Sequence, residues 1–138
     1  MKFKIANREI GNNQDPLIIA EIGINHNGNL DKAIAIADSA IQSGAEVLKH
    51  QTHIPDEEMS QEALKAIPGN SKHSIYKIIK KCSLSEVDET KLMKYIISKK
   101  KIFISTPFSK AAVDRLVKFK VPAFKIGSGE WNNLELIE

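Results

Sequence analysis

Short apolar runs alternate with amphipathic stretches along most of this chain. Runs of this length, bounded by turn residues, are typical of strands that are buried on both faces of a sheet. Such strands are usually parallel, because the helices that connect them cover the sheet. The four runs that fit this pattern are 17–23, 46–51, 102–107 and 123–128.

The first residues follow a different pattern. Residues 2–10 alternate weakly between apolar and polar positions and end in Gly11-Asn12-Asn13, which is a turn signal. We therefore expect residues 1–15 to form an N-terminal hairpin extension. The main fold is expected to span residues 16–138.

Helical patterns separate the four predicted strands. A polar stretch over residues 52–72 is too long for an ordinary loop, so we expect it to contain some helix of its own. A further helix is expected over roughly 73–82, where apolar residues recur at helical spacing. Residues that can cap the other predicted helices stand directly before them, at Asn29, Ser85 and Ser109.

The resulting order is β-α-β-α-β-α-β, with a helical insertion after the second strand. This order predicts an α/β fold with parallel strands and right-handed crossovers. Two architectures fit it, a doubly wound sheet or part of a (β/α)8 barrel.

Composition narrows the functional classes. The chain has 138 residues, a net charge of +3 and lysines spread along its length, so no nucleic-acid partner is expected. The run Lys99-Lys100-Lys101 falls where a helix should end, and cations there complement the helix dipole. Cys82 is the only cysteine and is expected to be a small buried residue. No signal core or membrane-length apolar stretch is present, which favours a cytoplasmic protein without a membrane partner.

Polar residues occur near the C-terminal ends of the predicted strands. Because side chains alternate between strand faces, one face begins with apolar residues in every strand and ends with a polar one. The C-terminal ends of parallel strands carry the chemistry in barrel enzymes. The residues selected in this way are Glu21, Lys49, Gln51, Thr106 and Lys125, and Ser128 and Glu130 follow in the next loop.

The two lysines carry the chemical argument. A buried ammonium group is costly unless an anion meets it, so Lys49 and Lys125 together favour a phosphate or carboxylate ligand. A glutamate and a glutamine nearby suit sugar hydroxyls. His26 is expected to be a hydrogen-bonding loop residue and His50 a core histidine, since it points away from the face of Lys49. No histidine pair has metal-ligand spacing, so none is assigned a metal.

Several segments resemble the motifs of the sialic acid synthases. They are EIGINHNGNL, VLKHQTHIPDEEMS, IPGN, FISTPFS and KIGSGEWNN, in this order between Pro16 and the last residue. These enzymes condense phosphoenolpyruvate with N-acetylmannosamine to give N-acetylneuraminic acid. The resemblance implies a (β/α)8 barrel, a C-terminal antifreeze-like domain, a homodimer and a manganese or magnesium ion held by two histidines.

Residue by residue, the resemblance implies two groups of contacts. Lys49, Thr106, Lys125 and Ser128 match positions that bind phosphoenolpyruvate. Glu21, Gln51 and Glu130 match positions at the amino sugar and the reacting centre, with Glu130 as a candidate base for water.

The chain is short for this family. A complete barrel needs about 250 residues, so these residues would form its first half, with the metal ligands and the antifreeze-like domain outside the chain. The 138 residues alone are therefore expected to be inactive. Other possibilities are a synthase of legionaminic or pseudaminic acid, a Schiff-base aldolase, or a non-catalytic half-barrel.

Overall fold

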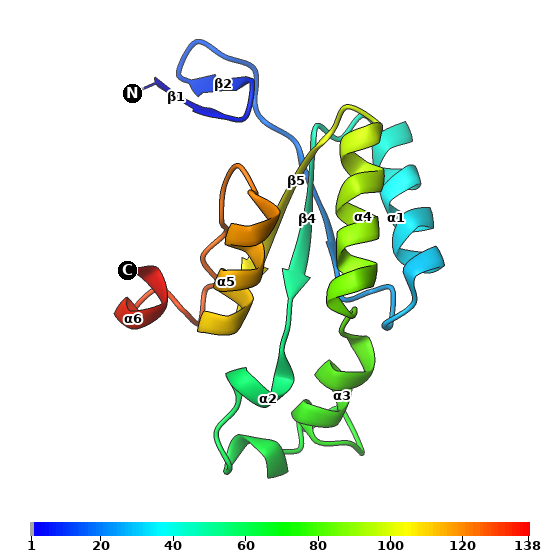
Figure 1. Cartoon of the computed structure of the whole chain (residues 1–138), viewed down its shortest axis with the longest axis vertical. Helices are drawn as coiled ribbons and strands as arrows, with labels where there is room; N and C mark the ends of the chain where they lie inside the picture. Colours follow the sequence, from blue (N-terminus) through cyan, green and yellow to red (C-terminus); the bar gives the residue numbers. More distant parts are fainter. Residues whose placement is uncertain (1) are drawn as a thin grey trace.

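The computed structural model describes residues 2–138. A parallel sheet stands at its centre, helices α1, α4 and α5 pack around the sheet, and an antiparallel hairpin lies beyond one end of the sheet (Figure 1). Within these residues, no helix is long and apolar enough to cross a membrane. The elements are β1 Lys2–Ile5, β2 Arg8–Gly11, β3 Ile19–Gly23, α1 Leu30–Gln42, β4 Val47–Thr52, α2 Pro55–Glu58, the 3-10 turn η1 Ala63–Lys65, α3 Ile75–Cys82, α4 Glu86–Ser98, β5 Ile102–Pro107, α5 Lys110–Phe119 and α6 Leu134–Ile137.

The sheet has the order β3-β4-β5, and both neighbouring pairs are parallel. Successive strands are therefore neighbours, each reached through at least one helix, as the α/β prediction requires. The expected helical insertion is confirmed, because α2, η1 and α3 all lie between β4 and α4.

The fourth predicted strand is not formed. Residues 123–128 make only an isolated bridge between Phe124 and Ser105, with the Lys125 amide donating to the Ser105 carbonyl at 3.1 Å. Pro122 precedes the segment and Gly127 interrupts it, so only a few residues could join a ladder. The segment still lies beside β5, which is the neighbour that the prediction requires.

The N-terminal hairpin is confirmed, with β1 and β2 paired from Lys2↔Gly11 to Ile5↔Arg8. The chain reverses at Ala6 and Asn7, where Ala6 has a left-handed φ of 52°. A second turn follows β2, as expected, and there the Gln14 amide donates to the Gly11 carbonyl at 3.0 Å.

The helix caps follow the sequence pattern closely. The side chains of Asn29, Ser85 and Ser109 each accept a backbone hydrogen bond from the first turn of their helix. Helix α4 ends at Ser98, so the three lysines of 99–101 do follow a helix end. Cys82 is buried, as predicted.

The main core lies between the sheet and the helices. Every second residue of the strands points into it, and α1, α4 and α5 contribute the other side. The opposite face of the strands therefore carries the polar residues that are predicted to bind a ligand. The fully buried core side chains include Ile22, Leu48, Phe103, Leu92, Ile96 and Leu116.

Candidate active site at the strand ends

The strand register brings the predicted residues of β3 and β4 together. Glu21 pairs with Lys49 in the ladder, and their side chains form an ion pair with Lys49 Nζ 2.6 Å from Glu21 Oε1. The Lys49 side chain is 10% exposed and that of Glu21 is 56% exposed. The buried ammonium group of Lys49 thus has an anionic partner, the carboxylate of Glu21 at the edge of the site, as its burial requires.

Gln51 lies one step further along β4, close to the end of β3. A side chain on Gly23 would meet Gln51 Oε1 at 3.7 Å, Asn25 Nδ2 at 3.8 Å and Glu21 Cγ at 3.8 Å. Gly23 also has a positive φ of 55°, which disfavours other residues. Glu21, Gln51 and Asn25 therefore surround a backbone position that glycine keeps open.

Thr106 stands opposite Gln51 in the parallel ladder between β4 and β5. It is 1% exposed, and its hydroxyl Oγ1 has no hydrogen-bond partner among the described residues. A side chain on Gly127 would meet Thr106 Cγ2 at 3.6 Å, so the Gly127–Gly129 loop lies directly beside it. A buried hydroxyl without a partner is uncommon, and it is a natural contact for a bound ligand.

Lys125 and Ser128 lie on the other side of β5 from Lys49. The bridge between Ser105 and Phe124 places Phe124 on the core side, so Lys125, the next residue, is directed to the face of Thr106. Lys125 is half-buried and Ser128 is exposed. Because β5 separates the two lysines, a ligand that touched both would have to lie across Thr106.

Glu130 lies beside Gly127, on the Thr106 side of the site, since a side chain on Gly127 would meet Glu130 Cγ at 3.5 Å. Its carboxylate accepts a hydrogen bond of 2.7 Å from Asn133 Nδ2, and its amide donates to the Gly127 carbonyl at 2.9 Å. It lines a hollow of about 230 Å³ together with His53 and Glu58. His53 is buried there, with Nδ1 2.9 Å from Glu58 Oε1.

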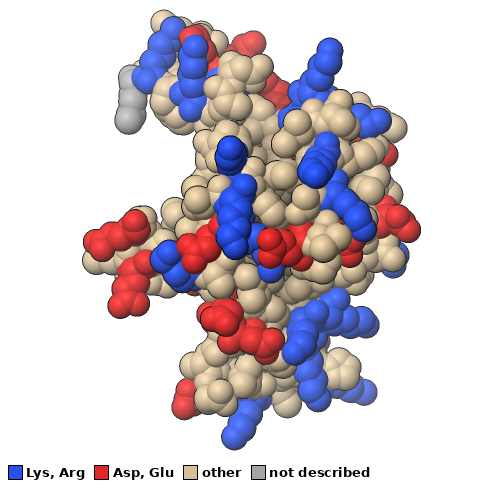
Figure 2. Space-filling view, in the orientation of Figure 1, with Lys and Arg blue, Asp and Glu red and all other residues tan. Residues whose placement is uncertain are grey.

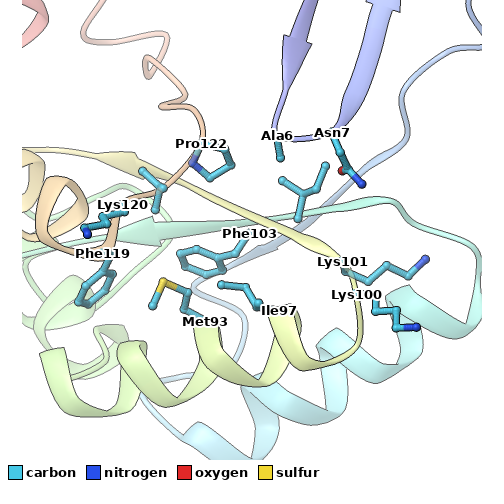
Figure 3. A pocket seen from close by; sticks show the side chains of 12 residues that line it. Ala6, Asn7, Met93, Ile97, Lys100, Lys101, Phe103, Phe119, Lys120 and Pro122 are labelled. Carbon is cyan, nitrogen blue, oxygen red and sulfur yellow. The ribbon is translucent and has the colours of Figure 1, made fainter.

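A different hollow, of about 510 Å³, opens at the opposite end of the sheet (Figure 3). Figure 3 shows it between the hairpin turn, the end of α4 and the start of β5, with Met93, Phe103 and Phe119 on its walls. It contains none of the residues selected from the sequence. It lies at the N-terminal ends of the strands, away from the ends that carry Gln51 and Thr106.

A buried polar network, which the sequence did not reveal, lies behind the strand ends. We define it as His26, His50, Thr52, Glu89, Ser105 and Arg115. Its centre is Glu89 of α4, which is 1% exposed. His50 Nδ1 lies 3.0 Å from Glu89 Oε1, Thr52 donates to the same oxygen, and Arg115 Nη1 donates to Oε2 at 3.0 Å.

Burial opposes the ionisation of Glu89, but hydrogen bonds from His50, Thr52 and Arg115 hold the pKa of that carboxyl below its usual range. Burial, together with the neighbouring His50, lowers the pKa of His26 from 6.5 to about 4. His50 is a hydrogen-bonded core histidine and His26 a hydrogen-bonding loop residue, as predicted. One signal in the sequence could have indicated this network. Glu89 is an acidic residue on the same face of α4 as the apolar residues Leu92, Met93 and Ile96.

Between residues 2 and 138, no three His, Cys, Asp or Glu side chains form an arrangement that could hold a metal ion. Figure 2 shows Lys and Arg side chains dispersed over the visible face, with acidic side chains among them. Charge alone therefore does not mark the site on this face.

Comparison with known proteins identifies the family. Residues 36–138 match the family model described as the NeuB family. The chain belongs to the NeuB family. The spore coat polysaccharide biosynthesis protein SpsE of Bacillus subtilis is 34% identical over 137 residues, which are 99% of this chain and 37% of that protein. The N,N'-diacetyllegionaminic acid synthase of Legionella pneumophila is 34% identical over 134 residues, covering 93% and 37%.

Solved structures agree with this assignment to the NeuB family. The structure superposes on N-acetylneuraminic acid synthetase of Leptospira borgpetersenii, solved with citrate, with a TM-score of 0.82, 25% identity and coverage of 99% of this chain and 45% of that one. The SpsE structure gives a TM-score of 0.74 at 33% identity, covering 99% and 36%. This chain thus spans well under half the length of the curated NeuB relatives that it matches.

Proposed function

We propose that this chain supplies the first half of the active site of a sialic acid synthase, which condenses phosphoenolpyruvate with N-acetylmannosamine to N-acetylneuraminate and phosphate. The observation that carries the proposal is the buried Thr106 hydroxyl, which has no hydrogen-bond partner among residues 2–138. Thr106 lies between Gln51 of β4 and the Gly127–Gly129 loop. Membership of the NeuB family supports the reaction class.

Phosphoenolpyruvate would lie on the Thr106 side of the site. Lys125 and Lys49 would offset the charges of its phosphate and carboxylate groups, and Thr106 would donate its hydroxyl hydrogen to one oxygen. Ser128, which is exposed between Gly127 and Gly129, adds a second hydroxyl. The resemblance of these positions to the synthase motifs supports this assignment, as does their place on β4, on β5 and in the segment beside β5.

The amino sugar would lie toward β3. Glu21 is paired with Lys49 but largely exposed, so its second oxygen can accept a hydrogen bond from a sugar hydroxyl. Gln51 and Glu21 both border Gly23, whose missing side chain leaves space beside them. The two substrates would therefore meet over β4.

The reaction follows from this placement. The methylene carbon of phosphoenolpyruvate attacks the aldehyde carbon of the open-chain sugar and forms the new C–C bond. The C=O π bond of the aldehyde breaks, and its oxygen takes up a proton from water to become a hydroxyl group. Water then adds to the cationic carbon that carries the phosphate, with Glu130 taking its proton, and phosphate leaves by cleavage of the C–O bond. Lys49 and Lys125 hold the anionic reactant in line for the attack.

The manganese or magnesium ion implied by the resemblance would polarise the aldehyde. The described residues contain no group of three or more His, Cys, Asp or Glu side chains that could hold it. No step above is therefore assigned to a metal, and the expectation remains that its ligands lie outside residues 1–138.

The proposal is tested by turnover of phosphoenolpyruvate and N-acetylmannosamine. The chain is assayed alone and as a completed barrel, by which we mean residues 1–138 continued by the second half of a related synthase. We expect the thiobarbituric acid assay to detect sialic acid only with the completed barrel. A completed barrel that consumes phosphoenolpyruvate only with a legionaminic or pseudaminic acid precursor would place the protein in those branches instead.

A further inference from the structure

The buried network ends at the loop that borders the sugar side of the candidate site. This loop, residues 24–28, follows β3 and carries Asn25 beside Gly23. His26 of this loop is fully buried, and the Gly28 amide donates to His26 Nδ1 at 3.1 Å. His26 Nε2 lies 3.2 Å from His50 Nε2. The loop also contacts the end of α3, where Cys82 Sγ lies 3.6 Å from Asn27 Oδ1. The His26–His50 contact in addition joins it to β4.

The direction of each hydrogen bond in this network follows from the first one. Because the Gly28 amide donates to His26 Nδ1, the proton of neutral His26 must be on Nε2. His26 Nε2 therefore donates, and His50 Nε2 accepts. The proton of His50 is then on Nδ1, where it is donated to Glu89 Oε1. One set of tautomers satisfies all these contacts. The Gly28 amide, which can only donate, fixes the tautomer of His26, and the Glu89 carboxylate, which can only accept, fixes that of His50.

The same carboxylate also holds the strand ends from behind. Thr52, which directly follows Gln51, donates to Glu89 and lies 2.7 Å from Ser105 Oγ. Ser105 directly precedes Thr106. The network therefore contacts the core side of two strand ends whose other side carries Gln51 and Thr106.

We propose that Glu89 is a positioning residue for the candidate site. Through His50 and His26 it holds the 24–28 loop, and through Thr52 and Ser105 it holds the ends of β4 and β5. The proposal deepens the function proposed above and rests on it for its kinetic consequence. It predicts that loss of the carboxylate acts on the sugar side, where the loop lies, more than on the side of Lys125.

The first test measures tautomers in the chain itself. Magic-angle-spinning ¹⁵N NMR of histidine-labelled chain, which does not require a monomeric sample, should show His50 protonated on Nδ1 and His26 on Nε2 at pH 7.5. Glu89→Gln presents either an oxygen or an NH₂ group to His50, so His50 should become a mixture of tautomers. His26 should stay protonated on Nε2, because the Gly28 amide still donates to Nδ1. In the state where His50 carries its proton on Nε2, the His26–His50 hydrogen bond is lost. Glu86→Gln is the matched control, since Glu86 is on the same helix, is exposed and lies 3.7 Å from Arg115 Nε. It should leave both tautomers unchanged.

The second test uses kinetics of the completed barrel. Glu89→Gln and His26→Leu should each raise the KM for N-acetylmannosamine about tenfold and change the KM for phosphoenolpyruvate less than twofold. His26→Leu keeps Glu89 paired with Thr52 and Arg115, so it tests the loop contact even if Glu89→Gln does not fold. His26→Gln, which restores a donor to His50, should recover part of the loss.

The outcomes separate the two proposals. Unmutated histidines in the opposite tautomers, or equal losses for both substrates in His26→Leu, would overturn the positioning role. If the unmutated completed barrel makes no sugar acid, the proposed function fails. Tautomers that change in Glu89→Gln, together with faster hydrogen exchange at the Gly28 amide, would then still support the role of Glu89 in holding the loop. Unchanged tautomers and unchanged exchange would reject it.

Discussion

Lys49 Nζ lies 2.6 Å from Glu21 Oε1 across the β3–β4 pair, and the lysine is buried whereas the glutamate is largely exposed. This asymmetry predicts unequal effects on stability. Glu21→Gln leaves a buried ammonium group without its anion, and we expect a loss of about 1–3 kcal/mol. Lys49→Met leaves a carboxylate that water can solvate, so its effect should be smaller. Urea unfolding of the two variants measures the difference. Equal losses would contradict the assignment of Lys49 as the buried partner.

Ligand affinity should depend on the two lysines. In the completed barrel, Lys49→Met or Lys125→Met removes a charge-assisted contact worth roughly 1.5–3 kcal/mol, which weakens phosphoenolpyruvate binding about 10- to 100-fold. Lys94→Met, on the exposed side of α4, is the control and should bind normally. Titration calorimetry measures all three. Unchanged affinity in both strand variants would reject the anion site.

Thr106 offers a test that separates stability from binding. Its buried hydroxyl has no partner among the described residues, so Thr106→Val removes a polar group without breaking a contact. We expect a change in unfolding free energy of less than about 1 kcal/mol, because no hydrogen bond of the fold is lost. Phosphoenolpyruvate affinity should nevertheless fall, and Thr106→Ser should preserve it. A large loss of stability with normal affinity would mean that the hydroxyl serves the fold.

Acid should destabilise the fold through the buried network. The pKa of His26 falls from 6.5 to about 4 on folding, so the folded protein binds fewer protons than the unfolded chain in that interval. The neutral imidazole therefore contributes stability above pH 6.5, and this contribution is lost as the pH falls from 6.5 toward 4. We expect this loss to be on the order of 2–3 kcal/mol. The depressed pKa of Glu89 adds a further loss at lower pH.

Denaturant unfolding between pH 8 and 4 measures this dependence. In His26→Leu the slope between pH 6.5 and 4 should be reduced, while the control His73→Leu, which alters an exposed residue, should retain it. A slope that is the same in all three proteins would show that His26 is not the group responsible.

Much of this architecture could be predicted because local signals agreed with tertiary packing. The caps at Asn29, Ser85 and Ser109 formed as the sequence indicated, and alternation along β4 separated Lys49 from His50 correctly. Residues 123–128 failed as a strand because apolar character does not supply ladder partners, and Gly127 ends the run early. A strand forms only when two chain segments pair, and the sequence pattern of one segment does not show whether its partner is in place.

The pairings of the site could be predicted only in part. Face alternation placed Glu21 and Lys49 on one surface, but their ion pair depends on the β3–β4 register, which no local pattern gives. Glu89 was missed for a related reason. It is one of three acidic residues in the first turn of α4, where a helix N-terminus favours acids whether or not they are buried. The burial of Glu89 depends on its partners His50 of β4 and Arg115 of α5, which the pattern of α4 does not show.

The bond that breaks can be followed with labelled substrate. In the completed barrel, phosphoenolpyruvate carrying heavy oxygen at the bridging position should deliver the label to phosphate, because in the proposed mechanism water attacks carbon and the C–O bond is cleaved. Mass spectrometry of the released phosphate detects the label. Label retained in the sugar acid would mean cleavage of the P–O bond and a different role for both lysines.

The proposed function requires that the strand ends of this chain bind phosphoenolpyruvate for condensation with an amino sugar. The most direct measurement is formation of sialic acid by the completed barrel, with manganese present, compared with its Lys125→Met variant. We expect product from the unmutated protein, at least tenfold less from the variant, and no lysine adduct with pyruvate after borohydride treatment. Equal product from both proteins, or a borohydride-trapped lysine, would contradict the account.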